Sequence, residues 1–151
     1  MDSQHIYKSH NKSLILYHYA CPARYRQEVF TEGVEKSLKE ICLEMGKCYE
    51  IHFVEIGSDI DHVHFLIQGI PTMSPSSIIQ KVKSITARQI FSDHPEVKKK
   101  LWGGQFWTSG YYVNTVGQHG NEQTIGEYVR NQGKNYKQIH RDQLTLFEGL
   151  T

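Results

Sequence analysis

Apolar runs along the chain predict four strands. Residues 13–20 (SLILYHYA) and 48–57 (CYEIHFVEIG) are rich in β-branched and aromatic side chains, as strands usually are. The run 62–70 (HVHFLIQGI) follows a short polar turn, SDID, and predicts a third strand that forms a hairpin with the second. Residues 101–117 are aromatic and interrupted by glycines, and they predict a fourth strand.

Apolar residues at helical spacing predict three helices. The first covers 25–46 and ends at Gly46, because glycine is a common residue at helix C-termini. The second covers 71–91, where a Ser-Pro pair marks the start of a basic amphipathic segment. The third covers 121–140, and the tail from 141 to 151 is expected to be a loose arm.

The order of these elements indicates the fold class. Strand, helix, strand, strand, helix and strand form the split βαββαβ order of a ferredoxin-like α+β domain. We therefore expect an antiparallel sheet with helices on one face and an extra C-terminal helix. The 151 residues suit one domain, and neither a repeat nor a linker divides them.

Composition narrows the class of protein only slightly. The 17 basic and 16 acidic residues give a net charge of +1, which predicts no partner by itself. Six basic against two acidic residues between 79 and 102 give that segment a charge of +4, which suits contact with a polyanion. Three cysteines without a C-x-x-C pair argue against a disulfide framework or a zinc knuckle, and favour a reducing cytoplasm. No apolar run approaches the roughly 20 residues that a membrane span needs.

The third predicted strand carries a pair of histidines. Side chains alternate across a strand, so His62 and His64 share one face and are close enough to bind one metal ion. Half-exposed histidines are also common on sheets, so the pair alone is compatible with an ordinary polar face. His52, on the preceding strand, is a competing candidate but lacks a partner two residues away, and His18 is expected to be a surface or core residue. The opposite face, expected to pack on the helices, carries Val63, Phe65 and Ile67.

The last predicted helix contains an unusual combination of residues. Tyr128 and Gln132 are four positions apart and therefore share a helix face. Gly126 and Gly133 flank them, and each weakens a helix interior by about 1 kcal/mol relative to alanine. Such a helix is either marginal or able to move. The simpler alternative is that Tyr128 is a packing aromatic.

Together these segments resemble a known family. DHVHFLIQ, KSITARQIF, LWGGQFWTSGYYVNTVG and EYVRNQGKNY have the same order and spacing as in the single-tyrosine HUH transposases of the IS200/IS605 group of bacterial insertion sequences. The resemblance extends from Leu14 to Tyr136. It implies a ferredoxin-like fold and a homodimer. It also implies a single-stranded DNA substrate with hairpins at the ends of a mobile element, which the enzyme cuts and rejoins.

The resemblance also implies roles for individual residues. His62 and His64 would bind a divalent metal with Gln132 as the third ligand, and Tyr128 would be the nucleophile that forms a covalent 5′-phosphotyrosine link to DNA. Nitrogen and oxygen ligands favour Mg²⁺ or Mn²⁺. In the family this helix can dock on the partner subunit, so one active site can draw on two chains.

DNA contacts are expected from the basic residues. Lys81, Lys83 and Arg88 on the second predicted helix would hold the phosphate backbone, although a solvated helix face is an equal alternative. Relatives often have a KYRR segment where this chain has ARYRQ, which keeps Arg26 as a DNA contact but lacks one charge. Aromatic residues that either stack on bases or pack in the interior are Trp102, Phe106, Trp107, Tyr111 and Tyr112.

Two other functions are compatible with the sequence. A domesticated HUH nickase or replication-type endonuclease would cut single-stranded DNA by the same chemistry without moving its own element. A ferredoxin-like nucleic-acid-binding module without catalysis would not need Tyr128 or Gln132. That second alternative leaves the joint occurrence of the histidine pair and the tyrosine–glutamine pair unexplained.

Overall fold

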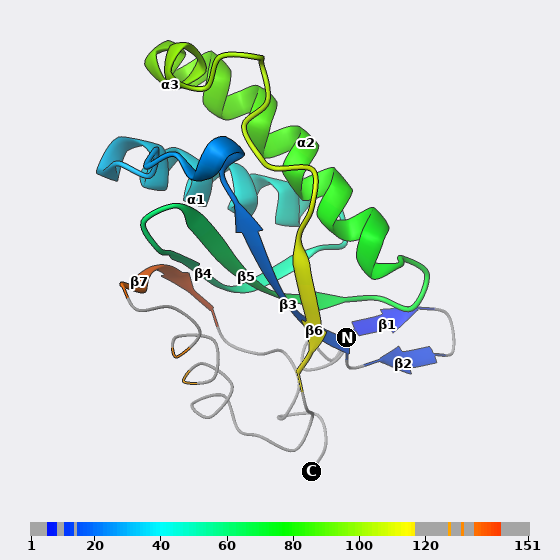
Figure 1. Ribbon diagram of the computed structural model, residues 1–151. Coiled ribbons are helices and arrows are strands. Elements are labelled where there is room, and N and C mark those ends of the chain that lie inside the picture. The colour runs from blue at the N-terminus through cyan, green and yellow to red at the C-terminus, as the bar shows by residue number, and fades with distance from the viewer. Residues whose placement is uncertain are drawn as a thin grey trace.

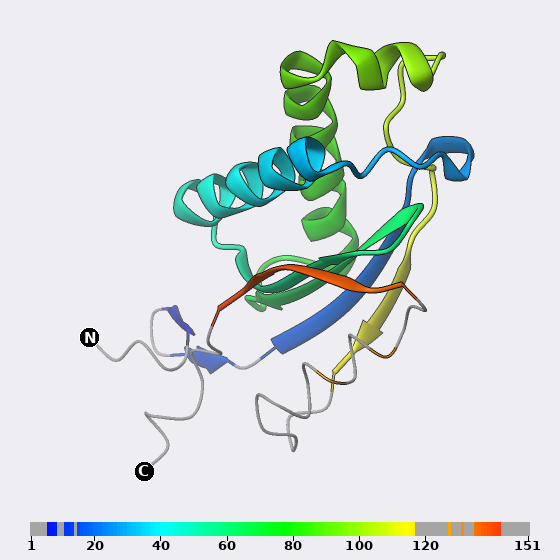
Figure 2. The same cartoon turned by 90° about the vertical axis from the view of Figure 1, so that its left-hand side faces the viewer.

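The computed structural model describes residues 6–8, 11–13, 15–116, 127, 131 and 135–142. A five-stranded sheet in the order β6-β3-β5-β4-β7 forms one layer, and helices α1 and α2 cover one of its faces (Figures 1 and 2). The strands of this sheet are β3 (Ile15–Pro22), β4 (His52–Ser58), β5 (His62–Gly69), β6 (Tyr112–Thr115) and β7 (Lys137–Arg141). A separate hairpin consists of β1 (Ile6–Lys8) and β2 (Asn11–Ser13). The helices are α1 (Glu32–Cys48), α2 (Pro75–Asp93) and α3 (Pro95–Lys100), with a 3-10 turn η1 (Arg24–Arg26).

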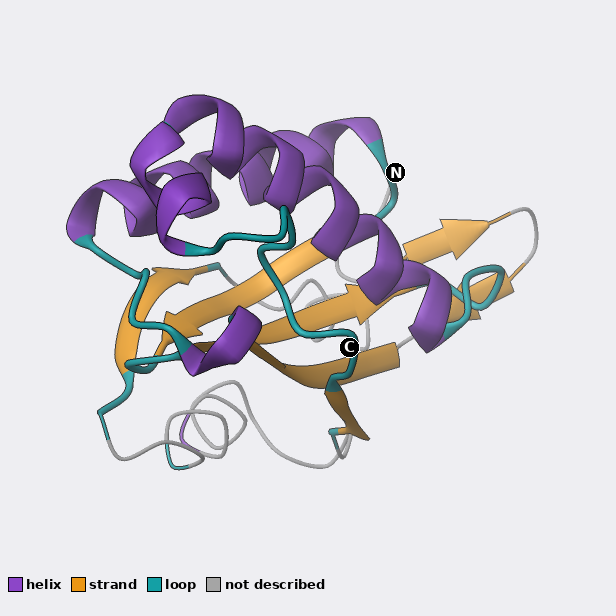
Figure 3. Cartoon of the chain, turned by 45° about the horizontal axis from the view of Figure 1, so that its top comes forward, coloured by secondary structure: helices purple, strands orange, loops and turns teal. Residues whose placement is uncertain are grey.

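The strand order confirms the ferredoxin-like prediction. Every neighbouring pair in the large sheet is antiparallel, and β5 lies between β3 and β4. Helix α1 connects β3 to β4, and the segment with α2 connects β5 to β6. Figure 3 shows the helices lying together over the sheet, which leaves its other face for functional side chains.

Polar side chains fix the starts of both long helices. Thr31 Oγ1 accepts a hydrogen bond from Val34 N, and Ser74 Oγ accepts one from Ser77 N. Such N-caps satisfy amide groups that have no partner inside the helix. The predicted end of the first helix at Gly46 is wrong, because α1 continues to Cys48 and Tyr49 is the cap. Its predicted start is also wrong, since residues 24–26 form the separate turn η1.

The core lies between the sheet and the helices. Val63, Phe65 and Ile67 of β5 are fully buried there, as the alternation along the strand predicts. They meet α1 and α2 through apolar residues at helical spacing, including Leu38 and Ile79. Complete burial of one such side chain stabilises the fold by about 1.5–3 kcal/mol.

The predicted strand over 101–117 is wrong for most of its length. Only Tyr112–Thr115 form a strand, and Trp107 makes an isolated bridge to Ala23. Gly103 and Gly104 have φ values of 103° and 78°, so the chain turns there instead of extending. Phe106 and Trp107 are buried in the core, whereas Trp102 and Tyr112 are exposed.

The predicted last helix and C-terminal arm also need correction. Residues 137–140 belong to strand β7, which pairs with β4, and Arg141 ends that strand. Asp142 N donates a hydrogen bond to Val54 O, so the chain is attached to the sheet at 141–142. Asn131 N donates to Glu127 O at 2.9 Å, which is the hydrogen bond of a helical turn. Tyr128, Gln132 and residues 143–151 lie outside the described residues.

Candidate metal centre and catalytic site

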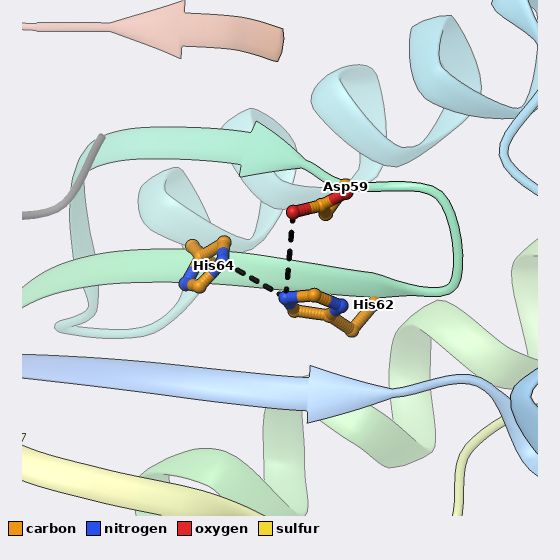
Figure 4. A group of neighbouring side chains, drawn as sticks. All are labelled: Asp59, His62 and His64. Atoms are coloured by element: carbon orange, nitrogen blue, oxygen red, sulfur yellow. Dashed lines mark hydrogen bonds and ion pairs between the residues drawn. The ribbon is translucent and has the colours of Figure 1, made fainter. Parts of the chain in front are cut away.

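The β4–β5 hairpin brings three side chains that could hold a metal ion together at its closed end. Asp59 follows β4, and His62 and His64 lie on β5 (Figure 4). His62 Nε2 is 3.1 Å from His64 Nε2 and 3.9 Å from Asp59 Oδ2. The ligand atoms of the three residues all lie within 4.8 Å of one another. Two nitrogens and one carboxylate oxygen at this spacing fit a divalent cation.

Asp59 is the residue that sequence reasoning missed, because SDID was interpreted only as a turn. The hairpin closes through Asp59 N, which donates to His62 O at 2.8 Å. Asp59 Oδ1 accepts from Ile60 N, and Oδ2 is the oxygen closer to His62. A carboxylate three residues before the first histidine, at the closed end of a hairpin, is the signal that identifies it.

Each imidazole is held by a neighbour through its other ring nitrogen. His62 Nδ1 is 2.8 Å from Asp61 Oδ1, and His64 Nδ1 is 3.0 Å from His18 Nε2. Because both Nδ1 atoms are engaged, both Nε2 atoms are directed toward the candidate metal position. Metal-binding histidines usually have such a second hydrogen bond, which fixes the ring. His18, expected only as a surface or core residue, is therefore part of the site.

The hydrogen-bond partners indicate which nitrogens carry protons when a metal is bound. A carboxylate only accepts, so Asp61 takes the Nδ1–H of His62 and leaves a lone pair on His62 Nε2. His64 binds the same ion only when its Nε2 also lacks a proton. Its Nδ1–H then donates to His18 Nε2, which requires a neutral His18. These tautomers are assigned from the bonding pattern.

Burial favours the neutral form of the inner imidazoles. His18 and His64 are 1% and 2% exposed, and burial lowers the pKa of each to about 4. On the pKa of His64, the charges of His18 and His62 act in the same direction as burial, whereas the charge of Asp59 opposes them. Neutral imidazole is the form that binds metals. Burial raises the pKa of Asp61, but the hydrogen bond from His62 and the charge of Arg26 outweigh it, so the net change is downward.

Small residues on both neighbouring strands make room for His64. Ala20 of β3 and Gly57 of β4 are its direct partners in the sheet. A Cβ at Gly57 would overlap the ring of Tyr136, so any other residue at this position would force that ring to move. The Tyr136 ring lies 5.6 Å from the His64 ring, centroid to centroid, and its hydroxyl donates to Glu55.

The chain that follows Tyr128 and Gln132 returns to this same site. Asn135 N donates to Asp59 Oδ2 at 3.4 Å, and Gln132 is only three residues earlier in the sequence. Three residues span at most about 10 Å. The structure therefore brings together His62 and His64 with the end of the Tyr128 segment, while the two predicted residues of that segment lie outside the described residues.

Arg26 is the predicted DNA contact that lies beside the metal cluster. Its Nη1 is 3.4 Å from Asp61 Oδ1, although its side chain remains 61% exposed. Tyr25 and Arg26 have φ values of 58° and 53°, a conformation that costs about 1–3 kcal/mol for each residue other than glycine. Backbone strain of this kind persists where surrounding contacts impose it, and it is concentrated at functional sites.

The other predicted DNA contacts do not join the metal cluster. Lys83 Nζ donates to the carbonyls of Thr108 and Gly110, so it holds the loop before β6. Lys81 lies over the Tyr49 ring at 4.2 Å, and Arg88 lines a groove between α1 and α2. Lys81 and Arg88 therefore belong to the helical layer, on the other side of the sheet from the histidines.

A cavity of about 680 Å³ opens beside the two histidines. It lies between the polar face of the sheet and the loop that precedes β6. Its mixed lining includes imidazole, guanidinium, hydroxyl and aromatic groups, which suits a ligand with both phosphates and bases. The lining residues are His18, Ala20, Pro22, Arg26, His62, His64, Thr108, Gly110, Tyr111 and Tyr112.

Comparison with known proteins identifies the family. The family model described as transposase IS200 like matches residues 11–132, and the chain belongs to this family. It is similar to the ISDra2 transposase TnpA of Deinococcus radiodurans, with 29% identity over 77% of this chain and 82% of that protein. It is also similar to the transposase for insertion sequence element IS200 of Salmonella typhimurium, with 27% identity over 82% of this chain and 80% of that one.

Solved structures agree with this assignment. A crystal structure of a candidate transposase from Deinococcus radiodurans has a TM-score of 0.62 and 26% identity, over 85% of this chain and 98% of that chain. A REP-associated tyrosine transposase bound to a REP hairpin shares the fold, with a TM-score of 0.53 and 9% identity over 83% of this chain and 68% of that chain. The chain is thus an IS200-like transposase, a class of DNA-cleaving enzymes that act in DNA transposition and recombination. Among the described helices, none has the length and apolar character to cross a bilayer.

Proposed function

We propose that this transposase cuts and rejoins single-stranded DNA at the ends of an insertion sequence, with Tyr128 as nucleophile and a divalent metal as cofactor. The observation that carries the proposal is the convergence of His62 Nε2, His64 Nε2 and Asp59 Oδ2 beside a cavity. His18 and Asp61 engage the Nδ1 atoms of both rings, which leaves both Nε2 atoms directed toward the same point. A binding module without catalysis would not need this cluster.

The donor set indicates which metal the site would take. His62 and His64 would supply two nitrogens, while Asp59 and Gln132 would supply oxygens. Nitrogen and oxygen donors without a thiolate suit Mg²⁺ or Mn²⁺ and argue against structural zinc. When bound, the ion would act as a Lewis acid on the non-bridging oxygens of the scissile phosphate.

Tyr128 would carry out a balanced exchange of phosphate esters. Its phenolic oxygen forms a bond to phosphorus while the bond from phosphorus to the 3′ oxygen breaks. The proton lost by the tyrosine hydroxyl ends on the 3′ oxygen, and the 5′ phosphate remains on Tyr128. Attack by a 3′ hydroxyl on this phosphotyrosine reverses the exchange and rejoins DNA, so no nucleotide cofactor is needed. A tyrosine has a pKa near 10, so catalysis depends on its position in line with phosphorus.

The attachment of the chain after Gln132 supports delivery of both residues to the metal cluster. Asn135 contacts Asp59, and Tyr136 contacts His64 and Glu55. These contacts place the end of the segment at the histidines of the same chain. In a homodimer with a shared active site, the residues before Asn135 would instead reach the partner's cluster. Both arrangements are compatible with the anchored end.

The proposed DNA partner is a single strand that carries hairpins at the element ends. A transposase with this fold has been solved with a REP hairpin, and we extend that kind of ligand to this chain. Arg26 borders the cavity at the metal cluster, where it would contact a phosphate of the cut strand. Lys81 and Arg88 would contact DNA elsewhere, on the helical layer.

A covalent-adduct assay tests this proposal. Labelled single-stranded DNA from the element ends is mixed with the wild-type protein and with Tyr128→Phe, in Mg²⁺ or in EDTA. We expect a protein–DNA adduct on a denaturing gel only with the wild-type protein and Mg²⁺. A free 3′ hydroxyl end added afterwards should release the adduct as rejoined DNA. An adduct without rejoining favours the nickase alternative, and tight binding without any adduct favours the non-catalytic module.

A further inference from the structure

Two exposed aromatic rings form a stacked pair close to the metal cluster. Tyr25 is 48% exposed and Trp102 is 73% exposed, although large apolar rings usually seek burial. Their centroids are 5.7 Å apart and their planes differ by 23°, so the rings stack. One face of the Trp102 ring is covered by the Tyr25 ring. Much of the exposed surface of Trp102 therefore belongs to the opposite face of its ring.

Two turns that are far apart in the sequence hold this pair in place. Tyr25 lies in the η1 turn, in the left-handed conformation described above. The two residues before it are fixed by backbone hydrogen bonds, in which Ala23 N donates to Asp61 O and Arg24 N donates to Phe106 O. Trp102 precedes Gly103 and Gly104, whose positive φ values turn the chain. Lys100 Nζ donates to Glu28 O and ties the two turns together. The rings are therefore exposed on a fixed backbone.

The surroundings of the pair are basic. The guanidinium of Arg24 lies 4.9 Å from the centre of the Tyr25 ring. Residues 24–28 and 95–102 together carry five basic and two acidic side chains, so five minus two gives a charge of +3. The basic residues are Arg24, Arg26, Lys98, Lys99 and Lys100, and the acidic ones are Glu28 and Glu96. Aromatic faces among positive charges are the usual arrangement for binding single-stranded nucleic acid.

The pair is also linked to the candidate metal centre. Arg26, the residue next to Tyr25, contacts Asp61, and Asp61 contacts His62. A DNA strand whose phosphate lies at the histidines would therefore pass Arg26 and reach Tyr25 and Trp102 within a short distance along its backbone.

We propose that Tyr25 and Trp102 form a stacking site for an unpaired base of the DNA strand, close to the phosphate that is cut. This inference rests on the proposed function, because it takes the cut strand as the ligand. Duplex DNA does not offer a free base face, whereas each unpaired base does. The positive charge of the surroundings favours a polyanion over an apolar protein partner. The site would accept any of the four DNA bases, because every base has an aromatic face that can stack.

Tryptophan fluorescence tests the stacking site without any DNA cleavage. The protein has two tryptophans, and Trp107 is buried while Trp102 is exposed. A hairpin-free oligothymidylate is titrated into Tyr128→Phe protein in EDTA, and quenching gives the affinity. We expect DNA to quench Trp102, and Trp102→Ala to bind about tenfold more weakly by fluorescence anisotropy of labelled DNA. Trp102→Phe keeps a ring and should lose much less affinity.

A matched control is available on the helical layer. Tyr49 is 40% exposed and lies beside Lys81, so it has similar chemistry away from the metal cluster. Tyr49→Ala keeps the charge of Lys81, which is the group proposed to contact DNA there, and should weaken oligothymidylate binding far less than Trp102→Ala. The deficit of Trp102→Ala should persist as salt is raised, because stacking releases no counterions.

Three outcomes would overturn the stacking site. These are wild-type affinity in Trp102→Ala, an equal loss in Trp102→Ala and Trp102→Phe, or an equal loss in Tyr49→Ala. Failure of the stacking site is distinguishable from failure of the proposed function. The covalent adduct requires Tyr128 and metal, and it is measured separately with DNA from the element ends.

Discussion

Strand β5 has two buried faces with opposite chemistry. Toward the helices, Phe65 and its apolar neighbours are fully buried. On the other face His64 is 2% exposed and Gln68 is 0% exposed, so they are buried as deeply. Apart from Leu66 between them, these residues have polar neighbours: His64 meets His18, and Gln68 meets His52. In this molecule the exposed fraction of a side chain does not distinguish a core residue from a residue of the candidate site. The polarity of the side chains that it contacts does distinguish them.

The two faces also differ in what they require of their residues. Apolar packing needs shape and volume but no directional partner. A buried polar group needs a correctly placed donor or acceptor, and the loss of that partner costs about 1–3 kcal/mol. We therefore expect substitutions toward the helices to change the free energy of unfolding. Substitutions on the polar face should change metal binding as well as stability.

The largest effect is expected from Phe65→Ala on the helix-facing side. Removal of a fully buried phenyl ring leaves a cavity and should lower the free energy of unfolding by about 3–5 kcal/mol. Urea denaturation followed by far-ultraviolet circular dichroism measures this change. The conservative variant Phe65→Leu should cost much less, because it leaves a smaller cavity. An unchanged urea midpoint in Phe65→Ala would show that β5 does not pack as described.

A smaller effect on stability, together with a loss of metal affinity, is expected from His18→Phe. The substitution keeps a planar ring but removes the nitrogen that engages His64 Nδ1. Loss of such a partner usually weakens metal binding about 10–100-fold. Isothermal titration calorimetry with Mn²⁺ measures the affinity directly, without DNA.

Two further variants separate a positioning role for His18 from simple packing. His18→Gln offers an amide oxygen to His64 Nδ1–H and should recover part of the Mn²⁺ affinity. His52→Phe removes an imidazole that contacts Gln68 and Asp142, not the metal cluster, and should leave the affinity unchanged. Equal weakening in His18→Phe and His52→Phe, or no recovery in His18→Gln, would contradict the role of His18.

The same contrast explains which parts of the structure were predictable from sequence. The alternation in 62–70 predicts both faces of β5, because side-chain direction in a strand follows directly from position. The strand and helix order predicts the sheet, since local hydrophobic periodicity carries that information. The histidine pair identifies the face with the candidate metal centre, because its two members are neighbours in sequence.

The partners supplied by other elements were not predictable. His18 reaches His64 only through the register of β3 against β5, and Asp59 is directed by the closure of a hairpin. Residues 137–140 follow a helical pattern but form the edge strand β7, since Lys137 bonds the buried carboxylate of Glu35 and β4 offers an open edge. Tertiary contacts outweigh local preference in these cases.

The smallest effect on stability is expected from a substitution at Gly57, where β4 contacts Tyr136. Gly57→Ala adds a methyl group that would overlap the Tyr136 ring, so it should lower the free energy of unfolding by roughly 1 kcal/mol. The cost is at the low end for overpacking because the overlapping atoms are the outer atoms of one side chain and not backbone. Gly110→Ala, with no atom within 4 Å of the added carbon, should be neutral in the same urea titration. With Tyr136→Ala as background, Gly57→Ala should also become neutral. An equal cost in both backgrounds would mean that Tyr136 does not pack on Gly57, and that the Tyr128 segment is not anchored beside the metal cluster of its own chain.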